Sequence, residues 1–164
     1  MNSKIVTADE AVALIQDGNT LCCNGFVQSG YPDALLAALE RRFLETGSPK
    51  NLTLIAAAGQ SDGKERGTNR LGHEGLLRRV VSGNWGRMPR VVKLAQENKI
   101  FGYNLPQGVI CQLYRTRASG QPGLFSKIGL HTFVDPRLEG GRVNEITTKD
   151  IVNLVNIDGE EWLF

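Results

Sequence analysis

Short apolar runs alternate along the chain with segments of helical period. Residues 20–23 and 52–58 are apolar runs bounded by Gly, Asn or Pro, which is typical of short buried strands. Residues 100–104 form a third run of this kind. Because residues 52–58 are apolar at nearly every position, we expect this strand in the middle of a parallel sheet that helices cover.

The helical segments lie between these runs. Directly after the first strand, apolar side chains from Leu35 to Phe43 recur at i, i+1, i+4 and i+8, which predicts a helix over residues 34–43. Near the amino terminus, Thr7 and Glu10 have the spacing of a capping box and predict a short helix. The remaining predicted helices cover residues 74–81, 89–99 and 109–117.

This order of elements predicts an α/β fold with an open, mostly parallel sheet flanked by helices. A β-hairpin is predicted at the carboxyl end, where residues 154–157 and 160–164 flank Asp158-Gly159. The chain ends inside that second apolar strand, so we expect a truncated fold. The last strand is then expected to expose its edge and to invite association through Trp162, Leu163 and Phe164.

Length and charge narrow the class of protein. The 164 residues, 41% of them hydrophobic, suit one soluble domain over residues 1–164. Lys and Arg number 19 against 17 Asp and Glu, with no basic stripe interleaved with aromatic residues, so no nucleic-acid partner is expected. No apolar stretch reaches the roughly 18 residues that span a bilayer, and no signal-peptide core follows Met1. We therefore expect a cytoplasmic protein without a membrane partner.

The residues that most often carry metal or acid–base chemistry form no pattern here. The three cysteines have neither metal-ligand spacing nor an even disulfide count, so we expect buried, reduced thiols and no metal. His73 and His131 lack a partnered Asp or Cys motif, which favours structural or surface roles. Trp85, between glycines, is expected to be a packing anchor. No geometry for a carboxylate pair follows from the spacing of Asp62, Glu65, Asp135 and Glu139.

Glycine-containing polar segments follow the first two predicted strands. Residues 24–32, Asn-Gly-Phe-Val-Gln-Ser-Gly-Tyr-Pro, connect the first strand to its helix. Backbone N–H groups in a glycine loop before a helix favour a carboxylate, a phosphate or a developing oxyanion. Residues 59–67 follow the 52–58 strand, at the end where open α/β sheets bind ligands. A solvated loop explains residues 59–67 equally well.

Residues 25–32, Gly-Phe-Val-Gln-Ser-Gly-Tyr-Pro, resemble the Gly-Phe-x-x-x-Gly-x-Pro core of the class I coenzyme A transferase signature. Pro106-Gln107-Gly108 is similar to the Pro-Gln-Gly segment of the same family. A colinear match to the acetate and propionate CoA-transferase branch continues through residues 72–76, 83–86, 96–99 and 129–141. The resemblance spans nearly all of the chain and implies the CoA-transferase fold, which is similar to that of sugar-phosphate isomerases.

The resemblance implies a ping-pong transfer of coenzyme A between short-chain acids such as acetate and propionate. In the family, an enzyme glutamate attacks the acyl-CoA and gives an acyl-glutamyl anhydride, then an enzyme–CoA thioester. That glutamate lies in the second half of the family's sequence, and nothing in this chain matches its surroundings. The expected partners are thus acyl-CoA, a carboxylate, and the carboxyl-terminal half of the enzyme or further copies of the chain. Coenzyme A is expected as a substrate, with no tightly bound cofactor.

Site residues follow from the same resemblance. By its match, Gln107 takes the family role of stabilising negative charge on the reacting carbonyl oxygen. A neutral amide donor can do this without pairing permanently with a carboxylate nucleophile. Asn24 replaces the first of two glycines common in the signature, which leaves the preferred acyl size open. The expected substrate-binding residues are Asn24, Gly25, Phe26, Val27, Gly30 and Gly108.

Simpler interpretations stay open beside these. Gln107 also fits a first-turn helix residue in water, and the Gly25 to Gly30 loop also fits a turn that only packs helix against strand. The same fold serves sugar-phosphate isomerases and ligand-sensing regulators, and fold alone does not fix function. A non-catalytic binding module or an inactive remnant is therefore the alternative to a transferase.

Overall fold

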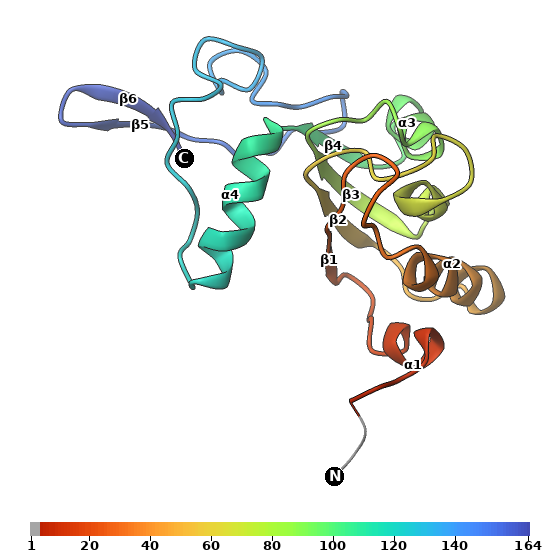
Figure 1. Ribbon diagram of the computed structural model, residues 1–164. Coiled ribbons are helices and arrows are strands. Elements are labelled where there is room, and N and C mark those ends of the chain that lie inside the picture. Colours follow the sequence, from red (N-terminus) through yellow and green to blue (C-terminus); the bar gives the residue numbers. More distant parts are fainter. Residues whose placement is uncertain (1–3) are drawn as a thin grey trace.

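The computed structural model describes residues 4–164 and is built around a four-stranded parallel sheet (Figure 1). The strands lie in the order β1-β2-β3-β4, and each pairs in parallel with the next. This confirms the predicted α/β class and the central position of the 52–58 run. The strands are β1 (Thr20–Cys23), β2 (Leu52–Ala56), β3 (Leu77–Ser82) and β4 (Phe101–Asn104). Their connections contain α2 (Asp33–Thr46), the 3-10 helix η1 (Gly67–Leu71) and α3 (Pro89–Gln96).

The remaining elements lie at the two ends of the chain. Helix α1 (Ala8–Val12) carries the predicted capping box, in which the Thr7 hydroxyl accepts from the Glu10 N–H at 3.2 Å and the Glu10 carboxylate accepts from the Thr7 N–H at 2.7 Å. Helix α4 (Gln107–Ala118) follows β4, and the hairpin of β5 (Leu154–Ile157) and β6 (Glu160–Leu163) extends away from the main sheet (Figure 1). Within residues 4–164 no helix combines the length and the apolar character needed to cross a bilayer.

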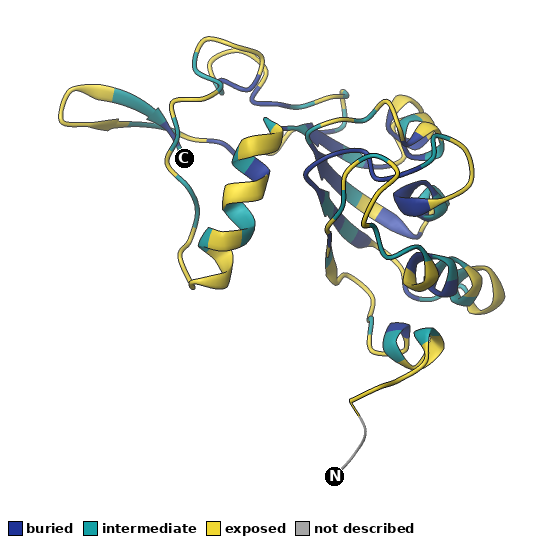
Figure 2. Ribbon diagram, viewed as in Figure 1, coloured by how far each residue is buried: buried dark blue, intermediate teal, exposed yellow. Residues whose placement is uncertain are grey.

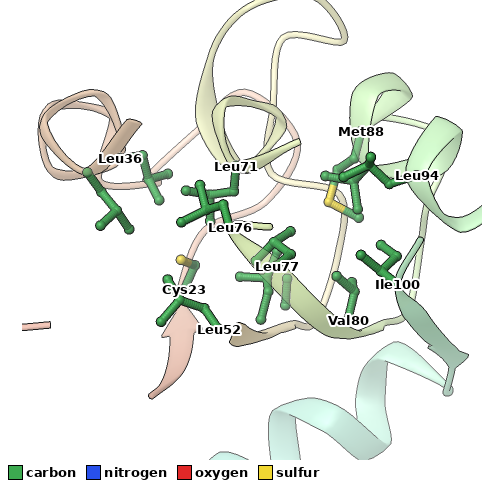
Figure 3. Packing of buried hydrophobic residues seen from close by; sticks show 14 of the residues in the cluster. Cys23, Leu36, Leu52, Leu71, Leu76, Leu77, Val80, Met88, Leu94 and Ile100 are labelled. Carbon is green, nitrogen blue, oxygen red and sulfur yellow. The ribbon is translucent and has the colours of Figure 1, made fainter. Parts of the chain in front are cut away.

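One face of the main sheet is covered by α2, η1 and α3. Figure 3 shows side chains from these elements gathered over the strand residues Leu77 and Val80. Leu36 and Leu39 of α2 are buried in this core as predicted, whereas Leu35 stays 40% exposed. The apolar face of α2 is thus narrower than its sequence pattern predicts.

The other face is covered by α4 and by residues near the carboxyl terminus. Val81, Tyr103 and Ile110 are buried there, while Ile55 of the central strand is only half-buried. Figure 2 shows α4 exposed along much of its length. Strand β2 therefore has apolar neighbours on both faces, as predicted, but its second face is less completely covered.

The predicted helix over residues 74–81 is wrong. Leu77–Ser82 forms strand β3, which pairs in parallel with β2 on one side and β4 on the other. Val80 enters the core of the first face and Val81 that of the second, and both are β-branched residues that fit a strand. Pairing on both sides and burial on both faces outweigh the helical spacing of the apolar residues.

The predicted hairpin is confirmed, but its outer strand does not expose its edge as expected. Leu163 is 4% exposed and exchanges two 2.9 Å backbone hydrogen bonds with Ser126. Phe164 exchanges two 2.8 Å backbone hydrogen bonds with Asn153, and its ring lies 4.7 Å from that of Phe125. Ser126 thus covers the outer edge of β6 at Leu163, while the Asn153–Phe164 pair continues the ladder between β5 and β6 and Trp162 stays half-buried.

An ion-pair network joins α2 to η1 and α3. Asp33, the first residue of α2, accepts from Arg70 Nε at 3.0 Å and Nη2 at 3.3 Å. The Glu40 carboxylate accepts from Arg70 Nη1 at 3.0 Å and from Arg90 Nη1 at 3.3 Å, and lies 2.9 Å from His73 Nε2. Hydrogen bonds from Arg70 hold the pKa of Asp33 below its ordinary value. His73 therefore has a structural contact, as expected.

The lowered pKa of Asp33 predicts a pH-dependent contribution to folding. A carboxylate with a lowered pKa adds stability above its unfolded pKa and loses it as the pH falls through the folded value. We expect Asp33→Asn to lower the urea midpoint of unfolding near pH 7, and this difference to shrink as the pH falls below about 4. The control Asp158→Asn, in the exposed hairpin turn, should change little. A constant difference between pH 7 and pH 3 would contradict the ion-pair account.

Candidate active site

All four strands of the main sheet end at one edge. Because the strands are parallel, their carboxyl ends and the segments that follow them share that edge. Open α/β sheets bind ligands outside the carboxyl ends of their strands. The structure therefore brings to one edge the loop after β1, the 59–67 segment after β2, and the start of α4 after β4.

The glycine loop, residues 24–30, is tight and closed on itself. Phe26 and Ser29 exchange two 2.9 Å backbone hydrogen bonds, so the chain reverses over only two residues. A Cβ on Gly25, whose φ is +134°, would lie 2.8 Å from the Tyr31 nitrogen. Val27 has a φ of 52°, which is a strained region for a β-branched residue. The loop therefore holds Val27 at a backbone angle that a β-branched residue disfavours, and such strain is often found at functional sites.

The loop leaves backbone donors free at its tip. The N–H groups of Phe26 and Ser29 are used within the loop, whereas those of Val27, Gln28 and Gly30 donate to no other residue within 4–164. Phe26 is 60% exposed, so the loop presents an aromatic ring and free N–H groups to its surroundings. Such donors can bind an anionic oxygen.

Gln107 is the first residue of α4 and is exposed. Its position depends on Gly83, at the end of β3. A Cβ on Gly83 would lie 2.9 Å from the Gln107 Cα and 2.4 Å from the Ala57 carbonyl oxygen. The ends of β2, β3 and β4 thus meet around Gln107. Gly108 follows in open space, where an added Cβ would meet nothing within 4 Å.

Two hollows lie beside these residues. A groove of about 680 Å³ between the second face of the sheet and α4 is lined by Asn24, Cys22 and Tyr114, among others. A cavity of about 300 Å³ is lined by Gly83, Pro106, residues 128–129 and residues 132–134, among others. Asn24 therefore lies at the groove, and the neighbours of Gln107 lie at the cavity. Asn24 and the neighbours of Gln107 thus lie at the same end of the sheet, where the strands end, but they line different hollows.

The 59–67 segment is buried at both ends, whereas Lys64, Glu65 and Arg66 between them are exposed. Gln60 and Ser61 are fully buried, and the Gln60 side-chain amide donates to the carbonyl oxygens of Cys23 at 2.9 Å and Gly25 at 3.1 Å. Gln60 was not among the predicted site residues. Its only signal in the sequence is a polar residue directly after a buried strand, at the same edge as the glycine loop.

Burial disfavours ionisation of Tyr114 and Cys23, which argues against acid–base or nucleophilic roles for these two residues. Tyr114 Oη donates to the Ile55 carbonyl oxygen at 3.1 Å, and burial raises the pKa of Tyr114 to about 12. Burial likewise raises the pKa of Cys23 to about 11. The prediction of buried thiols is wrong for Cys22 and Cys111, which are exposed, although all three cysteines are free. Cys22 faces the open groove and Cys111 the exposed side of α4.

The other residues considered from the sequence have local structural contacts. Asp62 accepts from the N–H groups of Lys64 and Arg66, and buried Asp135 accepts from Arg137 Nη2 at 2.7 Å. Trp85 lies against Gly102, in line with a packing role. Within residues 4–164, no group of three His, Cys, Asp or Glu side chains could hold a metal ion.

Comparison with known proteins gives a consistent result. The Coenzyme A transferase family model matches residues 5–164. The chain is 43% identical over 162 residues to "Acetate CoA-transferase YdiF" of Escherichia coli K12, covering 98% of the chain and 30% of that protein. It is also 43% identical to "Caffeate CoA-transferase" of Acetobacterium woodii, covering 99% of the chain and 31% of that protein.

A solved structure matches equally well. The crystal structure of the YdiF acyl-CoA transferase of Escherichia coli O157:H7, as a thioester complex with CoA, superposes with a TM-score of 0.92 at 43% identity. The match covers 96% of this chain and 31% of that chain. The chain thus spans about a third of the length of the proteins it matches. It belongs to the coenzyme A transferase family, in the acetate CoA-transferase branch.

Proposed function

We propose that this chain is the amino-terminal part of an acyl-CoA:carboxylate CoA-transferase that moves coenzyme A between short-chain acids such as acetate and propionate. One observation carries the proposal: 43% identity to an acetate CoA-transferase extends over 98% of the chain and so takes in the glycine loop and Gln107. The substrates are an acyl-CoA and a free carboxylate. Coenzyme A is a substrate, and no tightly bound cofactor is proposed.

The proposed nucleophile is a glutamate carboxylate supplied by sequence outside this chain. Its oxygen forms a bond to the thioester carbonyl carbon, and the carbon–sulfur bond breaks to release CoA thiolate and an acyl-glutamyl anhydride. The thiolate then attacks the glutamyl carbonyl, which forms the enzyme–CoA thioester and releases the first carboxylate. A second carboxylate reverses these steps. No proton has to be removed, so His73 and His131 have no part in this route.

In this proposal, the chain supplies donors to the negative charge that develops on the carbonyl oxygen. Gln107 provides a neutral side-chain N–H at the edge where the strands end. The free N–H groups of Val27, Gln28 and Gly30 provide backbone donors of the same kind. Donors already held in place stabilise a developing oxyanion at little reorganisation cost. Asn24, Gly25, Phe26 and Gly108 complete the proposed substrate-binding surface.

We also propose that the chain works in association with the carboxyl-terminal half of the enzyme or with further copies, in the cytoplasm. In the described residues, β1 pairs only with β2 and so forms one edge of the main sheet. Unpaired strand edges favour pairing with another segment. The choice of acid is proposed to depend on Asn24, which lines the groove and replaces a glycine that is common in the family signature. Relatives named for acetate and for caffeate are equally similar to this chain, so overall identity does not distinguish these acids.

The proposal that the nucleophile lies outside this chain can be tested directly. The chain alone, mixed with acetyl-CoA and propionate, is expected to yield no propionyl-CoA by mass spectrometry. A chimera in which the chain replaces the matching 162 residues of Escherichia coli YdiF is expected to yield it. Formation of propionyl-CoA by the chain alone would disprove the proposal that the nucleophile lies outside this chain. A folded chimera without transfer, beside active YdiF, would favour the non-catalytic alternative.

The oxyanion role of Gln107 is tested in the same chimera. Gln107→Ala is expected to lower kcat about 10²-fold, because it removes one donor to the developing charge. Gln112→Ala, an exposed glutamine on the same helix, is the matched control and should leave kcat unchanged. Equal kcat values for the two variants would show that Gln107 is only a helix residue in water.

A further inference from the structure

The segment from Gln60 to Arg70 contacts the glycine loop at both of its ends. Gln60 bonds to Cys23 and Gly25, where the chain leaves β1. Gly67 and Arg70 bond to Asp33, where the chain enters α2. A single segment therefore fixes the entry and the exit of the loop.

At the entry, Gln60 replaces the strand ladder. The backbone pairing of β1 with β2 ends at Cys23 and Ala56. Just beyond that pair, the two hydrogens of the Gln60 amide reach the Cys23 carbonyl oxygen at 2.9 Å and the Gly25 carbonyl oxygen at 3.1 Å. Gln60 is fully buried, and its bond to Cys23 is buried while its bond to Gly25 is partly buried, so water has little access to these bonds. Fixing the Gly25 carbonyl fixes the peptide plane that leads into Phe26.

At the exit of the loop, charge-assisted hydrogen bonds to Asp33 hold the chain in place. The Asp33 carboxylate accepts from the Gly67 N–H at 2.8 Å and from Arg70 Nε at 3.0 Å. Charge-assisted hydrogen bonds of this kind are stronger than neutral ones. Asp33 also begins α2, so the contact sets where the loop stops and the helix starts.

The two anchors belong to one rigid unit. The Gln60 carbonyl oxygen accepts from the Thr68 N–H at 2.8 Å and from the Thr68 hydroxyl at 3.2 Å. A Cβ on Gly67, whose φ is +68°, would lie 1.9 Å from the same oxygen. Residues 60 and 67 are thus in direct contact, which only glycine at position 67 permits. A shift at one anchor is passed to the other.

We infer that Gln60 is a positioning residue for the transferase site: it contacts no substrate, and it holds the glycine loop so that the N–H groups at the tip face the reacting carbonyl oxygen. This inference rests on the proposed function for its catalytic consequence. The structural consequence, a loop held by Gln60, can be measured without any activity. The structural consequence and the catalytic consequence can therefore be contradicted independently of each other.

The experiment uses Gln60→Leu, which keeps the side-chain size and removes both donors. In the 164-residue chain, peptides covering residues 24–31 are expected to exchange about tenfold faster or more at the hydrogen-bonded Phe26 and Ser29 amides, since two hydrogen bonds that hold the loop are lost. Peptides of α3 should change much less. The matched control, Gln112→Leu on the exposed face of α4, should leave both unchanged.

In the YdiF chimera, Gln60→Leu is expected to lower kcat about 10²-fold, because misplacing a catalytic group by about 1 Å has this effect. The KM for acetyl-CoA is expected to change less than about threefold, since the interaction that Gln60 supports is made in the transition state rather than in the bound substrate. Exchange in residues 24–31 equal to that of Gln112→Leu would overturn the inference. Faster exchange with unchanged kcat would also overturn it. If the unmutated chimera is inactive, the proposed function fails while the exchange result still stands.

A milder variant covers the case in which Gln60→Leu does not fold. Thr68→Val removes one hydroxyl hydrogen bond to the Gln60 carbonyl and keeps the buried volume. Its exchange in residues 24–31 is expected to rise about threefold. No rise in a folded Thr68→Val chain would count against the rigid link between the two anchors.

Discussion

The structure depends on how backbone polar groups are satisfied where the four parallel strands end. Within the sheet, strands supply each other's partners, but beyond Cys23 and Ala56 that ladder stops. The carbonyl groups just past the ladder still need donors in a buried place. The Gln60 amide provides them, and this allows the glycine loop to leave the sheet in a fixed direction. A polar side chain buried beside a strand end thus connects the fold to the candidate site.

The donors proposed for catalysis are neutral, and the nearest charged groups of the supporting network are paired with each other. Gln107 and the loop N–H groups carry no net charge, whereas Asp33, Arg70 and Glu40 bond among themselves behind the loop. This separation suits a reaction in which a carboxylate attacks a neutral thioester. Arg117 also lines the groove, where its guanidinium donates to the carbonyl oxygens of Gln121 and Pro122. The network of Asp33, Arg70 and Glu40 holds the segment that contacts the glycine loop.

The sequence was sufficient for the parts of the fold that local pattern decides. Strands β1, β2 and β4, the helices around them and the Asp158-Gly159 hairpin follow from apolar runs, periodicity and turn residues. Strand β3 could not be predicted in this way, because the spacing of its apolar residues also fits a helix. Its pairing with β2 and β4 decides in favour of a strand. Gln60 could not be found from sequence either, since its role depends on a contact with Gly25, 35 positions away. The glycine loop and Gln107 came from family motifs, and the structure places both at one edge.

A crystal structure of the YdiF chimera trapped as its CoA thioester would locate the reacting carbonyl oxygen and so show whether Gln107 and the glycine loop donate to it. We expect that oxygen about 3 Å from Gln107 Nε2 and from a backbone N–H of the glycine loop, with Gln60 still bonded to Gly25. An oxygen that faces other donors, with Gln107 and the loop both beyond hydrogen-bonding distance, would contradict the account.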